Sequence, residues 1–462
     1  MRAVHFTDTY LPRRDGVVTS LRTLAAALTD AGHPGLIVVP RHPDQPAEPD
    51  VLRLRALPCG VADLRLSPWL LRGAAATGTI AEIAAVAPDV VHVHTPGPVG
   101  LLGVLTARRL GLPLVQTYHT DLHAYADAYR VPARALSAGV RLYARRLGVP
   151  RPAPSPATSH GPAHAHGPAH AHGPAHSHQH GSGKIHGHTR DHRPLASGAV
   201  ARRRAAMDAT NTLLLGGADA VVVPTRAVLD RIHLPVPADR VHLVPTGVAP
   251  RRTTAREVNA FRYGHGIAPS DRVVLYVGRI NREKGIDLLI AAFGRILAGC
   301  PAARLVLVGA LYEPRWLAGL LRELDPRVSA RIVLTGQQSP AVVAAAYGAA
   351  EVFAFASQTD TQALVLQEAG LAGVPVVLVD RALHAHGALA GAALRTDPEA
   401  GALAAGVLRL LLDPDAARRQ AATAAARAAE HTPARYAEAI REVYASAAGL
   451  ASRFNDRGRT RS

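Results

Sequence analysis

Two acidic residues eight positions apart, Asp360 and Glu368, flank the start of an expected helix. An apolar run at 352–356 ends in a polar loop, and from about Thr361 apolar residues recur at helical spacing. The carboxylate pairs of glycoside hydrolases lie roughly 5–10 Å apart, whereas eight residues of helix rise about 12 Å. We therefore expect these acids to hold different parts of one long ligand. The alternative is two solvated acids on a surface helix.

The loop that follows another apolar run, at 273–277, carries two cations suited to a diphosphate. Gly278 permits a tight turn there, while Arg279 and Lys284 offer donors to phosphate oxygens. Lysine occurs at only two positions, and 50 of the 52 basic residues are arginine. Because the other lysine, Lys184, lies in a low-complexity segment, we interpret Lys284 as retained for a specific role.

Helix N-termini offer further phosphate contacts, because their first N–H groups lack partners within the helix. The helix expected near Thr361 starts just beyond the carboxyl end of a strand, where open parallel sheets bind ligands. The residues at this start are Thr361, Gln362, Ala363 and Leu364. Gly16 occupies a similar loop-to-helix junction after the strand expected at 3–6, where a glycine lets the backbone approach a ligand. A plain turn at Gly16 is the alternative.

The elements that must position these residues alternate between strand and helix twice along the chain. Short apolar runs typical of buried parallel strands are separated by helical patterns in both halves. This alternation predicts an α/β fold of two doubly wound, Rossmann-like domains that face each other across a cleft. The expected parts are a first domain (1–148 and 199–247), an insertion (149–198), a second domain (248–432), a crossing C-terminal helix (433–450) and a basic tail (451–462).

Several segments resemble the retaining nucleotide-sugar glycosyltransferases of family 4, which have the GT-B fold. The acidic pair resembles the family's E-x7-E region, and residues 278–285 match its G-R-x4-K-G segment. In the first half, FTDTYLPRRDGVVTSL, VHVHTPGPVGLLG and VQTYHTDLHAYA also resemble family segments. The first of these three is most similar to members that glycosylate diacylglycerol or related membrane lipids. The resemblance covers about residues 1–148 and 200–450.

The resemblance implies a role for each candidate residue. The first domain would face the acceptor and the second would bind the nucleotide sugar. Arg279 and Lys284 would bind the diphosphate of the donor, and Glu368 would hold its ribose. Asp360 replaces the first glutamate of the family's pair and would lie near the donor sugar. The backbone at Gly16, Gly278 and 361–364 would complete the donor site.

Histidine 119 follows the strand expected at 114–118 and matches the position where the family places a histidine beside the donor sugar. We therefore expect His119 to be catalytic. A lone histidine is more often structural, and we assign His92 and His94 to that class.

Three departures from the family pattern bear on the donor site. Ala363 stands where a glycine is usual, and the usual aspartate after Gly309 is missing. Residues 381–397 lack the usual glycine-rich loop. A competing interpretation is therefore a catalytically weakened GT-B protein whose histidine-rich loop binds metal.

The resemblance implies transfer of a hexose, glucose or mannose, with retention of configuration. The donor would be a nucleotide sugar such as UDP-glucose or GDP-mannose, and no metal or other cofactor would be required. No further carboxylate is evident as a covalent nucleophile, so we expect a route assisted by the leaving group. The expected acceptor is a membrane lipid, and a soluble small molecule is the alternative.

Composition restricts the class of protein and its location. A chain of 462 residues with 48% apolar content can build two or three cores. Its two cysteines, Cys59 and Cys300, form no disulfide framework and no metal-binding spacing, which fits a reducing cytosol. We see no signal peptide and no apolar run near the ~20 residues of a membrane span. We expect a cytoplasmic protein that binds peripherally to the inner face of the plasma membrane.

The net charge of +17 is spread along the chain. It forms no dense block and no patch interleaved with aromatic residues, so we exclude nucleic acid and favour an anionic membrane surface. The basic helical stretch at 131–147 and Trp69 within 64–72 are candidate membrane contacts. The alternatives are a solvated surface helix and ordinary packing of the tryptophan.

The insertion contains 11 of the 24 histidines, all between His160 and His192. Its Pro/Gly/His composition cannot bury a core and predicts disorder. Imidazoles at this density would bind Zn²⁺ or Ni²⁺ adventitiously, without fixed geometry. A neutral, expanded linker is the alternative.

Overall fold

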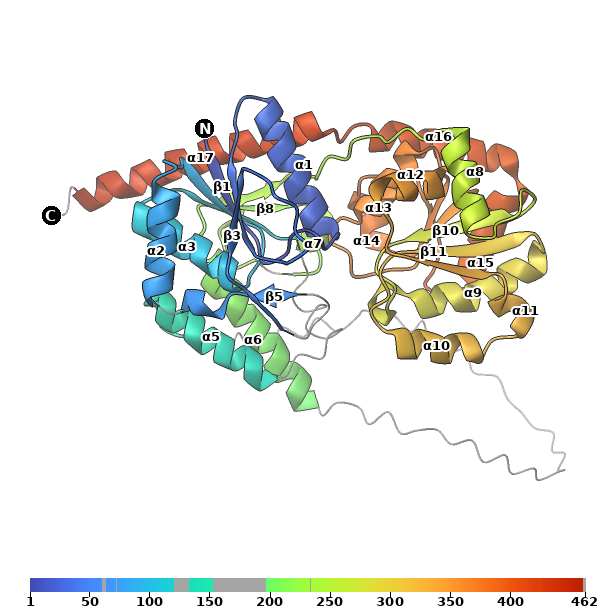
Figure 1. Ribbon diagram of the computed structural model, residues 1–462, viewed down its shortest axis with the longest axis horizontal. Coiled ribbons are helices and arrows are strands. Elements are labelled where there is room, and N and C mark those ends of the chain that lie inside the picture. Colours follow the sequence, from blue (N-terminus) through green and yellow to red (C-terminus); the bar gives the residue numbers. More distant parts are fainter. Residues whose placement is uncertain (60–63, 72, 120–132, 153–196, 233, 460–462) are drawn as a thin grey trace, which may run out of the picture.

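The computed structural model describes most of the chain outside the histidine-rich insertion (Figure 1). The described residues are 1–59, 64–71, 73–119, 133–152, 197–232 and 234–459. The predictions of disorder and metal binding in the insertion therefore lie outside the described residues.

Seven parallel strands form the sheet of the N-terminal domain. Their order is β3-β2-β1-β6-β7-β8-β9, so the chain first runs from β1 to one edge and then continues on the other side of β1. The strands are β1 (Ala3–Phe6), β2 (Leu36–Pro40), β3 (Val51–Leu54), β6 (Val90–Val93), β7 (Leu114–Thr117), β8 (Ala220–Val223) and β9 (Val241–Leu243). The reversal between β1 and β6 opens a crevice at the carboxyl ends of these strands.

The C-terminal domain repeats this plan with six parallel strands in the order β12-β11-β10-β13-β14-β15. The strands are β10 (Arg272–Val277), β11 (Ala303–Val308), β12 (Ile332–Gly336), β13 (Val352–Phe355), β14 (Val376–Leu378) and β15 (Leu394–Arg395). Here the reversal lies between β10 and β13. Two doubly wound sheets are the predicted α/β class, which is thereby confirmed.

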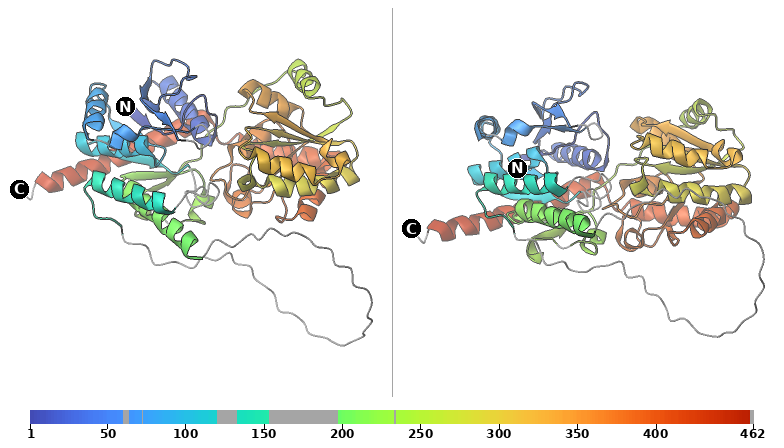
Figure 2. Two further views of the ribbon diagram at one scale, coloured as in Figure 1. Left: turned by 60° about the horizontal axis from the view of Figure 1, so that its bottom comes forward. Right: turned by 90° about the horizontal axis from the view of Figure 1, so that it is seen from below.

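Helices cover both sheets, and the two domains lie side by side (Figures 1 and 2). The N-terminal domain contains α1 (Gly16–Asp30), η1 (Pro68–Leu71), α2 (Gly73–Ala84), α3 (Pro98–Leu110), α5 (Ala133–Leu147), α6 (Ser197–Leu215), α7 (Arg226–Leu229), η2 (Ala238–Arg240) and the hairpin of β4 (Leu57–Pro58) and β5 (Arg65–Leu66). The C-terminal domain contains α8 (Ala255–Gly264), η3 (Arg282–Lys284), α9 (Ile286–Gly299), α10 (Pro314–Arg322), α11 (Pro326–Ser329), α12 (Pro340–Gly348), α13 (Leu364–Leu371), α14 (Arg381–His386), α15 (Ala400–Leu412) and α16 (Pro414–Ala428).

Helix α1 begins at Gly16 itself, at the expected loop-to-helix junction. The carboxylate of Asp15 accepts a hydrogen bond from the Val18 N–H at 3.0 Å and so caps the helix. Capping by Asp15 makes Gly16 the first helical residue instead of a loop residue.

Helix α17 (Pro433–Arg459) crosses back over the N-terminal domain after the second domain is complete (Figure 1). Its apolar residues share one buried cluster with strands β1, β6, β7 and β8. The residues from α17 are Tyr436, Ala437, Ile440, Val443, Tyr444 and Ala447. The hydroxyl of Tyr444 also hydrogen-bonds His92 Nδ1 at 2.8 Å, so the far end of the chain is tied to the first sheet.

The basic helix α5 turns its apolar side inward. Val140, Ala144 and Leu147 belong to the buried core of the N-terminal domain. The exposed side carries three arginines, Arg134, Arg141 and Arg145. The fold therefore favours a surface helix with a solvated basic side over a helix that inserts an apolar side into a bilayer.

Trp69 is held by neighbouring protein groups. The guanidinium carbon of Arg55 lies 4.5 Å from the centre of its ring, and its Nε1 donates to the Arg55 carbonyl at 2.5 Å. These contacts favour ordinary packing over a membrane contact for Trp69.

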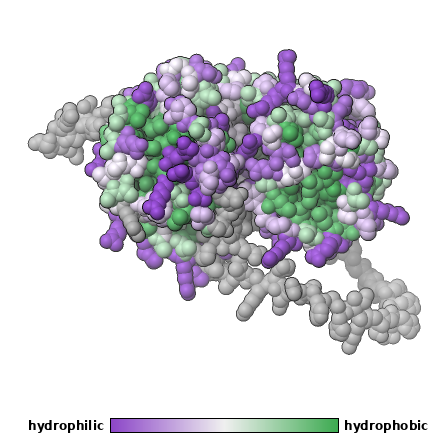
Figure 3. Space-filling model, in the orientation of Figure 1, coloured by the Kyte–Doolittle hydropathy of each residue, from purple (hydrophilic) through white to green (hydrophobic). Residues whose placement is uncertain are grey.

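Within the described ranges, no helix combines the length and the apolar composition needed to span a bilayer. Figure 3 shows an apolar area on the C-terminal domain, beside mixed polar and apolar surface on the N-terminal domain. The exposed large apolar side chains of the C-terminal domain include Leu311, Leu334 and Leu412. Apolar surface of this kind is common on folded proteins and carries no functional assignment here.

The two chain segments that cross between the domains touch at Gly247. The Val248 N–H donates to the His431 carbonyl at 3.2 Å. A Cβ added to Gly247 would overlap the Thr432 carbonyl and lie 2.6 Å from the Pro433 nitrogen. Because backbone would have to move on both sides, Gly247→Ala should lower the free energy of unfolding by at least ~1 kcal/mol. Urea denaturation measures this change.

Gly294→Ala is the matched control for that substitution. Gly294 lies inside α9, and an added Cβ would meet nothing within 4 Å. Alanine should therefore raise stability there by up to ~1 kcal/mol. Equal stability of the two variants would contradict the importance of the contact at Gly247.

Candidate active site

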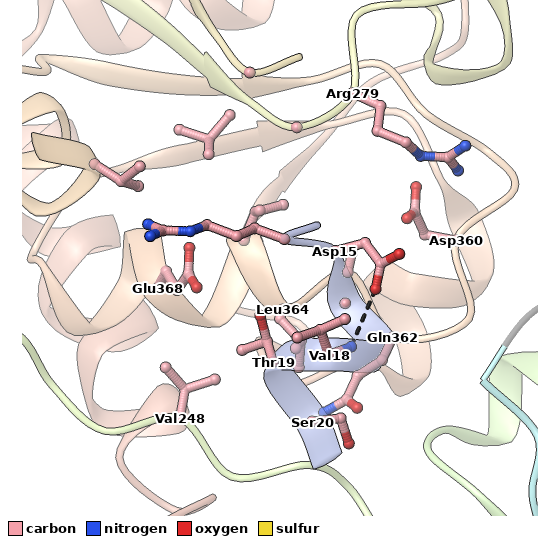
Figure 4. Close-up of a pocket in the computed structure, with 18 of the residues that line it drawn as sticks. Asp15, Val18, Thr19, Ser20, Val248, Arg279, Asp360, Gln362, Leu364 and Glu368 are labelled. Carbon is pink, nitrogen blue, oxygen red and sulfur yellow. Dashed lines mark hydrogen bonds between the residues drawn. The ribbon is translucent and has the colours of Figure 1, made fainter. Parts of the chain in front are cut away.

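A cavity of about 690 Å³ lies between the domains, at the carboxyl edges of both sheets. The N-terminal domain contributes the first turns of α1 and His119. The C-terminal domain contributes the loops after β10, β11 and β13 and the start of α13 (Figure 4). The residues expected at the site from the sequence all line this cavity: Gly16, His119, Gly278, Arg279, Lys284, Asp360, Thr361, Gln362, Ala363, Leu364 and Glu368.

Four charged side chains form a compact cluster at one end of the cavity. Lys284 Nζ lies 2.9 Å from Asp360 Oδ1 and 3.3 Å from Glu283 Oε1, and the lysine side chain is only 10% exposed. Arg279 Nη2 lies 3.1 Å from Glu283 Oε2. Two cations and two carboxylates therefore compensate one another, as buried charges must.

Asp360 is the centre of this cluster. Burial alone would raise the pKa of Asp360, but Lys284 and a hydrogen bond from Ser357 hold it below its ordinary value. The Ser357 hydroxyl donates to Oδ2 at 2.5 Å, while Lys284 binds Oδ1. Asp360 is thus an ionised carboxylate with both oxygens engaged, and its geometry orients Lys284.

Aromatic side chains support the same end of the cavity. The Tyr276 hydroxyl donates to the Arg279 carbonyl at 3.0 Å, beside Gly278 with its φ of 149°. The ring of Tyr312 lies 5.8 Å from the guanidinium carbon of Arg279 and 5.9 Å from that of Arg13. Arg13 comes from the N-terminal domain, so Tyr312 lies between cations of both domains.

Glu368 lies away from the charged cluster (Figure 4). The Tyr347 hydroxyl donates to its Oε2 at 3.0 Å. Burial raises the pKa of Glu368, although Tyr347 and the nearby Arg251 act in the opposite direction. A half-buried carboxylate with an oxygen still able to accept hydrogen bonds is suited to ligand hydroxyl groups.

The start of α13 differs from the prediction. The helix begins at Leu364, because Ala363 adopts a left-handed conformation with φ 55° and ψ 69°. Left-handed backbone favours glycine, which accounts physically for the glycine usual at this position. The alanine is accommodated here, and the residue is 8% exposed at the cavity wall.

Hydrogen bonds from the N-terminal domain hold the loop before α13. The Gln362 side chain donates to the Thr246 carbonyl at 3.0 Å and accepts from the Thr246 N–H at 3.2 Å. The Thr225 hydroxyl donates to the Thr361 carbonyl at 2.6 Å. Arg231 donates to the Asp360 carbonyl at 2.7 Å. The side chain of Gln362 therefore positions the loop.

His119 enters the cavity from the opposite domain. Its carbonyl accepts a hydrogen bond from the Thr361 hydroxyl at 2.7 Å, which links it to the loop before α13. Burial lowers the pKa of His119 to about 4, although nearby Asp15 acts in the opposite direction. His119 is therefore a neutral imidazole at physiological pH.

Glu283, Tyr312 and Tyr347 also line the cavity and were not predicted from the sequence. Glu283 lies between Arg279 and Lys284 in the G-R-x4-K-G segment, so the sequence alone could have indicated an acid beside the two cations. Tyr347 stands 21 residues before Glu368 on another helix, and no local pattern connects the two. One further group of described residues, His5, His92 and His94, has atoms close enough for a metal ion and lies behind His119.

Comparison with known proteins relates each half of the chain to a protein family. Residues 14–153 match the model of Glycosyltransferase Family 4, and residues 258–429 match that of Glycosyl transferases group 1. Together they cover about two thirds of the chain. The chain belongs to glycosyltransferase family 4.

Similar members of this glycosyltransferase family differ in their named activities. Alpha-monoglucosyldiacylglycerol synthase of Streptococcus pneumoniae is 24% identical over 386 residues, 82% of this chain and 70% of that protein. GDP-mannose-dependent alpha-mannosyltransferase of Mycobacterium tuberculosis is 26% identical over 399 residues, 82% of this chain and 79% of that protein. The crystal structure of Anabaena HepE in complex with UDP and glucose has a TM-score of 0.63 at 16% identity, covering 96% of this chain and 100% of that one. This last likeness shows the GT-B fold.

Ala363→Gly tests the strained start of α13 in this glycosyltransferase. Left-handed alanine costs roughly 1–2 kcal/mol, whereas glycine costs about 0.5–1 kcal/mol in lost chain entropy. The variant should therefore unfold at the same temperature as the wild type or a few degrees higher. Differential scanning calorimetry measures this, and Ala349→Gly, at the right-handed C-terminus of α12, is the control that should be destabilised. A destabilised Ala363→Gly would contradict the assigned strain.

Proposed function

We propose that this glycosyltransferase transfers a hexose from a nucleoside diphosphate sugar to an acceptor, with retention of configuration. The observation that carries the proposal is the cation pair Arg279 and Lys284, which lies at the cavity wall beside the start of α13. Two cations and helix N–H groups together are a site for a diphosphate. Glu368, farther along the same wall, is suited to the ribose hydroxyls.

The charge distribution supports a route assisted by the leaving group. As the bond between the sugar C1 and the phosphate oxygen breaks, negative charge gathers on the diphosphate. Lys284, Arg279 and the first N–H groups of α13 would stabilise that charge. The acceptor hydroxyl would attack C1 from the same side, and its proton would pass to the departing phosphate oxygen. Asp360 would act by orienting Lys284, and its expected contact with the donor sugar stays a prediction.

We infer that the acceptor is a membrane lipid. The relatives named above include a synthase of glucosyldiacylglycerol, which supports an acceptor of this class. The exposed arginines of α5 give the N-terminal domain a basic surface suited to anionic headgroups. Peripheral binding on the cytoplasmic face of the plasma membrane would bring such a lipid to the cavity.

We also propose that no resident metal is needed, because Arg279 and Lys284 can both donate hydrogen bonds to the oxygens of the diphosphate. The base and the sugar of the donor remain to be chosen, with UDP-glucose and GDP-mannose as the two candidates. Zn²⁺ or Ni²⁺ bound by the histidine-rich insertion would be adventitious and would leave donor hydrolysis unchanged.

A thermal-shift panel of nucleoside diphosphates, followed by calorimetry, tests the nucleotide site. Glu368→Gln should weaken binding of the preferred diphosphate by about 1.5–3 kcal/mol, the range for a hydrogen bond to a charged group. Glutamine keeps an acceptor for Tyr347, so folding should be preserved. Glu323→Gln, on the exposed surface at the end of α10, should bind as the wild type does. Unchanged binding by Glu368→Gln would remove Glu368 from the nucleotide site.

Lys284→Arg tests whether the site needs a compact cation. The lysine side chain is 10% exposed and already contacts two carboxylates, so a planar guanidinium has little room. The variant should lower kcat/KM for donor hydrolysis at least ~10-fold, about 1.4 kcal/mol of transition-state stabilisation. Lys284→Ala should lower it further.

Arg282→Lys is the matched control in the same loop, because Arg282 is half exposed and pairs with Glu313 outside the cluster. This variant should keep wild-type kinetics. Wild-type kinetics in Lys284→Arg would show that positive charge alone suffices.

A further inference from the structure

Four histidines from three neighbouring strands lie on one side of the first sheet. His5 on β1 pairs directly with His92 on β6, and side chains two residues apart on a strand share a face. His94 follows β6, and His119 follows β7 two residues after Thr117. All four therefore lie on the side of the sheet that α17 covers, where the chain reverses between β1 and β6.

Three of these histidines form a hydrogen-bonded chain that ends at the cavity. His119 Nε2 lies 2.9 Å from His94 Nδ1, and His94 Nε2 lies 3.1 Å from His5 Nδ1. At the inner end, His5 Nε2 is buried without a partner among the described residues. At the outer end, His119 lines the cavity, and no described residue hydrogen-bonds its Nδ1.

The chain is neutral. Burial lowers the pKa of His5 to about 4, and burial together with the neighbouring imidazoles lowers the pKa of His94 well below its ordinary value. A neutral imidazole has one N–H donor and one acceptor nitrogen. Two hydrogen bonds along three neutral rings therefore permit only two arrangements of protons.

The buried end of the chain selects one arrangement. If His119 donated to His94 and His94 to His5, the proton of His5 would sit on Nε2, as a buried N–H without a partner. If His5 donates to His94 and His94 donates to His119, His5 Nε2 carries no proton, and only its lone pair is left without a partner. Orphaned buried N–H groups are the rarer and more costly defect, which favours the second arrangement.

We propose that His5 and His94 are positioning residues that fix the tautomer of His119. His119 accepts through Nε2, so its proton is held on Nδ1 and is presented to the cavity as a donor. The group that this N–H meets is a hydroxyl of the donor sugar. The inference rests on the proposed function for its ligand, but the tautomer is a property of the protein alone.

A metal ion is the other use of three close histidines, and the hydrogen bonds oppose it. His92 already bonds Tyr444 through Nδ1 at 2.8 Å and Thr117 through Nε2 at 2.7 Å. Both nitrogens of His94 and one of His5 are engaged in the chain. A cation bound by all three rings would break several of these bonds, and the group supplies no carboxylate to balance its charge.

Two substitutions of His94, by residues that are isosteric with each other, separate hydrogen-bond donation from packing. The asparagine amide reaches about as far as Nδ1 of histidine and can donate to His119 Nε2, whereas an aspartate carboxylate can only accept. His94→Asn should keep kcat for donor hydrolysis within ~3-fold of the wild type, and His94→Asp should lower kcat at least ~10-fold, as a wrong imidazole tautomer does elsewhere. The binding constant of the free nucleoside diphosphate should not change in either variant. Equal kcat in the two variants would overturn the proposal.

Nitrogen NMR of the full chain with ¹⁵N-labelled histidine reads the tautomer directly and does not require that the variants fold. His119, identified by the signals lost in His119→Asn, should show a protonated Nδ1 and an unprotonated Nε2 in the wild type. The reverse pattern would overturn the proposal. One metal ion per chain that survives EDTA and is lost in His5→Ala would also overturn it.

The same data distinguish this inference from the proposed function. If no nucleotide sugar is hydrolysed but the tautomer is as stated, the proposed function fails and the positioning role stands. If the donor is hydrolysed with wild-type kcat in His94→Asp, the positioning role fails and the proposed function stands.

Discussion

The ion pair between Lys284 and Asp360 is the contact on which the charged end of the cavity depends. A buried ammonium or carboxylate without a partner costs far more than one interaction contributes, so each must be compensated. Asp360 follows β13 and Lys284 follows β10, the two strands at the reversal of the second sheet. Their pairing fixes the two loops relative to each other, and Glu283 and Ser357 complete the balance of charge and hydrogen bonds.

The loop after Asp360 is held from the other domain as well as from its own. Thr225, Arg231 and Thr246 bind its backbone or the Gln362 side chain, and Thr361 in turn binds the backbone of His119. The conformation of this loop is thus coupled to the relative position of the two domains. A change in domain spacing would therefore move the start of α13, which lines the cavity.

The sequence predicted the class of fold and the candidate residues that line the cavity, because both depend on patterns within short stretches of the chain. Buried parallel strands appear as apolar runs, and the residues just after them must meet at one sheet edge. Side-chain contacts between residues far apart in the sequence were not predictable, because tertiary packing determines them. Nothing local pairs Tyr347 with Glu368 or shows that Ala363 is left-handed, and this conformation is why α13 begins at Leu364 instead of near Thr361. The structural role assigned to His94 was incomplete for the same reason, since strand register brings it to His119.

The two walls of the cavity present groups that suit the proposed glycosyl transfer. Arg279 and Lys284, each paired with an acid, lie where a diphosphate would depart, whereas burial holds His119 neutral at the opposite wall. The sugar carbon gains positive character in the transition state of glycosyl transfer. An imidazolium beside that carbon would oppose the developing charge, while a neutral N–H still orients a hydroxyl. The burial of His119 itself keeps its pKa low, so under the proposed function the fold would set the protonation state of the one imidazole that reaches the cavity.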